Sequence, residues 1–367
     1  MMPFDLEGAA ELPAAGWRVG VLTEIAHWFD RAALGSLCFA FDRSLVVAPD
    51  ERARVARSAE PYRHANPDRF FAGFDAGEPI VPADVTTVGR LPGGAVLAWS
   101  FDSTVAWFDA GRRDAGLECG PNRRVPVQQW RHDAGARATV IALHGFTMGN
   151  ARIDAIVLHA RRWYDAGLDV VLLPLPLHGP RTPPDARFSG EAFGSWDVGR
   201  VNEAVRQAVF DVHRVQRWLR AASTPQVGLI GLSLGGYVAA LLAERSPDYA
   251  FVLPIVPAVC LATLPCRVFA LSRHGRQSEP PLALDEMRAG HCAHSPLGSP
   301  LRVPKERVMI IAGRGDRVVP PSHAHALWRH WNEPQIVWFG GSHFAPFSRH
   351  AIVRAGLAHV ARCIATR

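Results

Sequence analysis

From about residue 138 to its end, the chain alternates between short apolar runs and stretches with helical spacing, which constrains its fold more than any other feature. The runs at 138–143, 168–173, 227–232 and 251–256 are continuous rather than alternating apolar and polar. Continuous runs are typical of strands that are buried on both faces. Strands that alternate with helices form βαβ units around a parallel sheet. The sequence therefore predicts an α/β protein with a mostly parallel central sheet flanked by helices.

Further elements extend this pattern in both directions. We expect strands at 308–311 and 335–339, and helices at 153–166, 201–222, 235–245, 321–331 and from Ser348 onward. Upstream, the runs at 85–91 and 95–101 are joined by Pro92-Gly93-Gly94, which favours a hairpin. A further strand is expected at 125–130. These upstream strands would add an antiparallel part to one sheet edge.

The first 84 residues differ from the rest in character. Residues 21–41 have the spacing of a helix, whereas 61–77 are rich in Pro, Arg, Asp and Gly. We expect residues 1–84 to be a helical extension packed on a main domain at 85–367. The alternative is a docking or oligomerisation arm.

Within the main domain, about fifty residues, roughly 258–304, separate two predicted strands. This is far more than an ordinary βα connection. This insertion lies where a lid over an active site could form.

The strongest motif is Gly-Leu-Ser-Leu-Gly at 231–235, which matches G-x-S-x-G between a predicted strand and a predicted helix. The serine of such a motif occupies a tight, strained turn, so glycines are needed on both sides of it. The turn exposes the hydroxyl above the sheet, near the start of a helix whose dipole favours developing negative charge. Ser233 is therefore the candidate nucleophile.

A serine hydroxyl needs a general base to act as a nucleophile. His343 follows the last predicted strand, and Asp316 follows the strand before it. Open α/β sheets bind their ligands at the carboxyl ends of the strands, where all three residues would lie. We therefore predict a triad of Ser233, His343 and Asp316. Asp285 and Glu286 are weaker candidates for the acid, because they belong to the insertion.

These motifs resemble the α/β-hydrolase superfamily, over roughly residues 85–367, in the chain order Ser, Asp, His. His144-Gly145-Phe146 resembles the His-Gly oxyanion segment of that superfamily. The resemblance implies an oxyanion hole formed by the N–H groups of Leu234 and Phe146, with Thr147 as the alternative to Phe146. It also implies that His144 shapes its loop and that His178 is structural. The long N-terminal region is not explained by the resemblance.

The sequence offers little support for a cofactor or a metal. Neither a P-loop nor a dinucleotide-binding glycine pattern is present. His291, Cys292 and His294 cluster in the insertion, but a zinc site needs convergent ligands. His323 and His325 are two residues apart and would not share a helix face. We expect neither a cofactor nor a metal.

Composition argues against two other kinds of partner. The formal net charge is +6, but the arginines are scattered and Lys305 is the only lysine, so we expect no nucleic-acid binding. Residues 249–266 are uncharged, but Pro254, Pro257 and Pro265 make a membrane-spanning helix unfavourable.

Residues 1–20 carry early acidic residues and no long apolar run, so we expect no signal peptide. The six irregularly spaced cysteines indicate reduced thiols in a cytoplasmic protein, with disulfides as the alternative.

Taken with the resemblance, these features predict a serine hydrolase that cleaves an acyl ester of a small or medium-sized substrate through an acyl-enzyme intermediate. Residues 259–264 of the insertion are apolar enough to border an acyl pocket. The alternatives are a thioesterase or a peptidase with the same triad, or a catalytically silent binding protein. The sequence predicts neither the particular substrate nor the oligomeric state, for which a homo-oligomer is one alternative.

Overall fold

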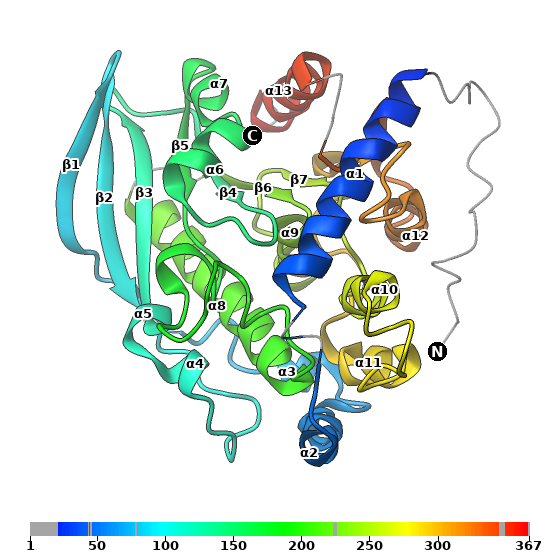
Figure 1. The fold of residues 1–367 in the computed structure, drawn as a ribbon. Helices are drawn as coiled ribbons and strands as arrows, with labels where there is room; N and C mark the ends of the chain where they lie inside the picture. Colours follow the sequence, from blue (N-terminus) through cyan, green and yellow to red (C-terminus); the bar gives the residue numbers. More distant parts are fainter. Residues whose placement is uncertain are drawn as a thin grey trace.

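A computed structural model describes residues 21–42, 44, 46–77, 79–222, 226–344 and 349–365 (Figure 1). Nine strands form one sheet in the order β1-β2-β3-β5-β4-β6-β7-β8-β9. The strands are β1 (Ala83–Leu91), β2 (Gly94–Asp102), β3 (Arg124–His132), β4 (Ala138–Leu143), β5 (Leu168–Leu172), β6 (Val227–Leu232), β7 (Val252–Ile255), β8 (Met309–Gly313) and β9 (Gln335–Phe339). Strands β4 to β9 pair in parallel, whereas β1, β2 and β3 pair antiparallel, including β3 against β5. The predicted fold class is confirmed.

Burial explains why the apolar runs predicted this sheet. Every residue of β4 and β5 is buried, as expected for strands covered on both faces. The edge strand β1 is mostly exposed. Alternation of buried and half-buried residues along β3 fits its place in the antiparallel part of the sheet.

Helices cover both faces of the sheet (Figure 1). One buried cluster joins sheet residues to three helices: α8 (Val198–Ala222), α9 (Leu234–Arg245) and α12 (Pro321–His330). A second cluster, on the other face, includes α7 (Ala160–Asp165) and α13 (Arg349–Ala365). The remaining α-helices are α1 (Val21–Ala40), α2 (Pro49–Ala59), α3 (Pro67–Phe70), α4 (Ala115–Glu118), α5 (Gly120–Arg123), α6 (Ala151–Val157), α10 (Thr263–Leu271) and α11 (Leu284–Gly290).

The structure departs from the expected helices in two places, and one expected helix start is not tested. The single helix expected at 153–166 is two helices, α6 and α7, because His159 between them has a left-handed backbone with φ 55°. Helix α2 was not predicted, and its eleven residues are mostly polar. The start expected for the C-terminal helix, Ser348, lies outside the described residues.

The N-terminal segment and the insertion lie together at one side of the sheet. Helix α1 contacts α10 of the insertion (Figure 1). Further along the N-terminal segment, Tyr62 and Phe70 are fully buried and belong to the same cluster as the sheet core. In the described part of the chain, no helix is both long and apolar enough to cross a membrane. Residues 249–266 contain β7, a loop and the start of α10.

Candidate active site

Ser233 lies on a strained turn between β6 and α9. Its backbone has φ 53° and ψ −109°, a conformation that residues with side chains rarely adopt. The neighbouring glycines are required sterically. A Cβ on Gly231 would lie 2.1 Å from the oxygen of Gly235, and one on Gly235 would lie 2.3 Å from that of Leu143. This is the nucleophile-elbow geometry that the motif predicts.

The structure places His343 between Ser233 and Asp316. Its Nε2 is 3.1 Å from Ser233 Oγ, and its Nδ1 is 2.6 Å from Asp316 Oδ2. With a proton on Nδ1, the imidazole donates to the carboxylate and Nε2 is free to accept from the hydroxyl. The side chains of His343 and Asp316 are only 6% and 1% exposed, so this chain of hydrogen bonds is shielded from water.

Asp316 is held on both carboxylate oxygens. Its Oδ1 accepts from the N–H groups of Val318 and Val319 at 2.9 and 2.8 Å, which leaves Oδ2 for His343. Burial by itself would lower the pKa of His343. The charge of Asp316, its hydrogen bond and the charge of Asp30 outweigh burial and raise the pKa of His343 above its ordinary value.

Asp30 of α1 contacts the candidate site, and sequence reasoning missed it. It is fully buried, and its carboxylate accepts from the backbone N–H groups of Arg317, His343 and Phe344. The sequence contained one signal. Asp30 lies one helical turn before Leu34, which is buried, so an acidic residue occupies the apolar face of a helix expected to pack on the main domain.

The two residues expected at the oxyanion hole lie beside Ser233. Leu234 is the first residue of α9, where an N–H group has no acceptor within the helix. Phe146 follows β4, and both residues line the same cavity as Ser233. His144 fixes this loop, because its Nδ1 contacts the oxygen of Gly145 at 2.8 Å and its Nε2 accepts from the Leu175 N–H at 2.9 Å. Burial lowers the pKa of His144 to about 4, which fits a neutral, structural residue.

The other candidates lie outside this arrangement. Burial lowers the pKa of His178 to about 3, and its Nδ1 contacts the oxygen of Pro176. The side chain of Asp285 is 92% exposed and pairs with Arg288. His291 and His294 contact the same acceptor, Asn202 Oδ1, at 2.7 and 2.5 Å. Across the described ranges, no group of three or more His, Cys, Asp or Glu residues could hold a metal ion.

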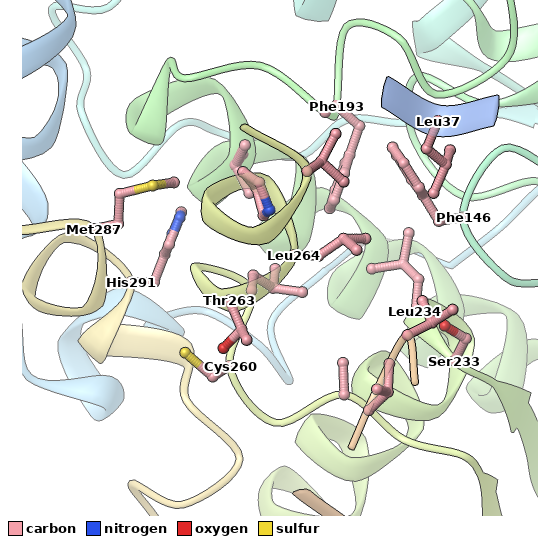
Figure 2. Close-up of a pocket in the computed structure, with 18 of the residues that line it drawn as sticks. Leu37, Phe146, Phe193, Ser233, Leu234, Cys260, Thr263, Leu264, Met287 and His291 are labelled. Carbon is pink, nitrogen blue, oxygen red and sulfur yellow. The ribbon is translucent and has the colours of Figure 1, made fainter. Parts of the chain in front are cut away.

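Two apolar cavities meet at Ser233. The smaller, of about 90 Å³, is lined by Phe146, Leu234 and insertion residues such as Leu264 and Met287 (Figure 2). The larger, of about 340 Å³, is lined by His343 together with residues of the second core face, Trp163, Ile311, Phe339 and Ile352 among them. Leu37 of α1 and Leu264 of α10 line both cavities. Helix α1 and the insertion therefore form part of the walls around the serine.

The sheet is mostly parallel, with antiparallel strands at one side. Ser233 lies at its carboxyl edge, on a strained strand-to-helix turn. Together these features define a class of enzyme fold. The chain has the fold of the α/β-hydrolase superfamily. Residues 190–355 match the family described as "Serine hydrolase (FSH1)". That match includes Ser233, Asp316 and His343 but not Asp30.

Solved structures with this fold include two bacterial esterases. Acetyl xylan esterase 1 from Thermoanaerobacterium sp. is 14% identical, with a TM-score of 0.56 over 83% of this chain and 98% of that one. Acetyl xylan esterase from Paenibacillus sp. has the same identity and TM-score, over 84% and 98% of the two chains. These similarities are at the level of the fold.

One curated relative is closer in sequence. Uncharacterized protein Rv2627c of Mycobacterium tuberculosis is 35% identical over 227 residues, which are 59% of this chain and 52% of the relative. The chain therefore spans about half the length of the curated relatives that it matches.

Proposed function

We propose that this serine hydrolase cleaves carboxylic esters with Ser233 as nucleophile, His343 as general base and Asp316 as the orienting acid. The observation that carries the proposal is the continuous line of contacts from Asp316 Oδ2 through the imidazole to Ser233 Oγ, at 2.6 and 3.1 Å. Such a line provides both a base for the hydroxyl proton and an acid that fixes the imidazole tautomer.

The reaction proceeds through an acyl-enzyme. His343 takes the proton of Ser233 as Oγ attacks the ester carbonyl carbon, and Asp316 stabilises the imidazolium that forms. The N–H groups of Leu234 and Phe146 hold the tetrahedral oxyanion, where one donor is worth roughly 10²–10³ in turnover. The intermediate collapses as His343 gives its proton to the leaving alcohol. Water, activated by the same base, then releases the acid.

We infer from the two cavities where each half of the ester binds. His343 lines only the larger cavity, and the leaving alcohol must take its proton from that imidazole. The alcohol therefore belongs in the cavity of about 340 Å³ and the acyl group in the cavity of about 90 Å³. The smaller space is below the ~150 Å³ of an engineered cavity that holds benzene. We accordingly infer esters of a short acyl group with a larger, apolar alcohol.

Two ester series test this assignment. In one, p-nitrophenyl esters run from acetyl to octanoyl; in the other, acetates run from ethyl to naphthyl. We expect kcat/KM to fall at least about tenfold between butyryl and octanoyl and to rise with the size of the alcohol, because each buried methylene contributes about 0.8 kcal/mol.

Two variants control the series. Ser233→Ala should abolish turnover of every ester. Met287→Ala, which enlarges the smaller cavity, should recover longer acyl groups without altering the preference for the alcohol. An octanoyl preference in the wild type would contradict the assignment. Turnover of thioesters or peptides but of no ester would contradict the ester reaction itself.

A further inference from the structure

We propose that Asp30 of α1 is a positioning residue of the active site, which joins the loop that carries Asp316 to the loop that carries His343. No motif marks this residue, and it lies outside the region that matches the serine hydrolase family. The kinetic part of its test rests on the proposed ester hydrolysis, whereas the spectroscopic part does not.

The contacts of Asp30 reach both loops at once. Its Oδ2 accepts from the N–H of Arg317, the residue after Asp316, at 2.8 Å and from the N–H of His343 itself at 3.2 Å. Its Oδ1 accepts from the N–H of Phe344, also at 3.2 Å. Because Asp30 is fully buried, these charge-assisted hydrogen bonds are protected from competition by water.

The two loops need such a bridge where the sheet ends. Strands β8 and β9 pair up to Gly313 and Phe339. Two more backbone hydrogen bonds follow, from the N–H of Arg314 to the oxygen of Phe339 at 3.0 Å and from the N–H of Gly315 to the oxygen of Gly341 at 2.9 Å. Beyond that point, the carboxylate of Asp30 accepts the N–H groups that no longer face a strand. A side chain from the N-terminal segment thus continues the connection between two loops of the hydrolase core.

Asp30 also adds charge next to the base. Among the described residues, the charged groups that act on His343 are the carboxylates of Asp316 and Asp30, from the loop after β8 and from α1. Burial opposes them by lowering the pKa of His343, and both carboxylates raise it. Removing the charge of Asp30 should therefore lower the pKa of His343.

The test compares Asp30→Asn and Asp30→Glu with the wild type. NMR titration of the His343 ring, in a Ser233→Ala background, reads its pKa without any need for activity. We expect Asp30→Asn to lower that pKa, to move the acid limb of kcat/KM to lower pH and to reduce kcat roughly 10- to 100-fold. Asp30→Glu keeps the charge but displaces the oxygens, so it should reduce kcat with little change in the pKa.

Asp42→Asn is the matched control, since Asp42 also ties the N-terminal segment to the body of the protein, through Arg273 and His274. It should leave the His343 titration and kcat unchanged. An unmoved titration together with unchanged kcat in folded Asp30→Asn would overturn the proposal. If that variant does not fold, unchanged kcat in Asp30→Glu would overturn it instead. A wild type that hydrolyses no ester would contradict the proposed function. The His343 titration would still test whether Asp30 positions the site.

Discussion

At the scale of single residues, a different set of local contacts holds each member of the proposed triad in place. Ser233 is held by a strained turn, of a kind that costs about 1–3 kcal/mol and persists only where the surroundings enforce it. Asp316 is held by two backbone N–H groups on one oxygen. His343 is held at its ring by Asp316 and at its backbone by Asp30. Local contacts therefore fix the geometry of the proposed triad.

The electrostatics of His343 predict the pH dependence of the wild type. A general base works only in its neutral form, so kcat/KM should fall as the pH drops through the pKa of His343. Because the two carboxylates raise that pKa, the acid limb should lie above the ordinary histidine value of about 6.5. A profile of kcat/KM from pH 5 to 9 would check this. A limb well below the ordinary value would show that burial, and not the carboxylates, controls the imidazole.

At the scale of elements, the turn between β6 and α9 depends on its glycines. A Cβ on Gly235 would lie 2.3 Å from the oxygen of Leu143 and 2.7 Å from that of His144, and neither backbone group can move freely. We expect Gly235→Ala to destabilise the protein by about 1–3 kcal/mol and to lower kcat by displacing Ser233.

Thermal unfolding and ester turnover, measured together, would test this prediction. Gly120→Ala is the control, because a Cβ at that position has no neighbour within 4 Å. Equal unfolding temperatures and equal kcat for the two variants would refute the steric account of the elbow.

Much of the sheet was predictable from the sequence, because continuous apolar runs report burial on both faces. Strands β4, β6 and β9 have the bounds that their runs predicted. The break between α6 and α7 was not predictable, since it rests on the backbone of His159 and not on a glycine or proline. Helix α2 was missed because its polar composition gives no apolar stripe.

The candidate site was predictable only in part. A local motif and the chain order predicted that Ser233, Asp316 and His343 lie at strand ends, and the structure brings their side chains into contact, while their catalytic roles stay predictions. The bridge from Asp30 depends on how α1 packs against two loops almost three hundred residues further along the chain, and nothing in its own segment encodes those partners. The oxyanion roles of Leu234 and Phe146 remain predictions.

At the scale of the whole molecule, the surroundings of the serine come from three distant parts of the chain. The sheet edge supplies Ser233 and His343, the insertion supplies Leu264 and Met287, and α1 supplies Leu37. The N-terminal segment and the insertion are thus structural parts of the cavities.

The central claim is that His343 activates Ser233, and an active-site label tests it most directly. The protein would be treated with a fluorophosphonate, and peptide mass spectrometry would locate the adduct. We predict a single adduct on Ser233 of the wild type, none on Ser233→Ala, and labelling slowed by at least about 10³-fold in folded His343→Ala. A folded wild type that takes up no label, an adduct on another residue, or His343→Ala that labels at the wild-type rate would contradict the claim.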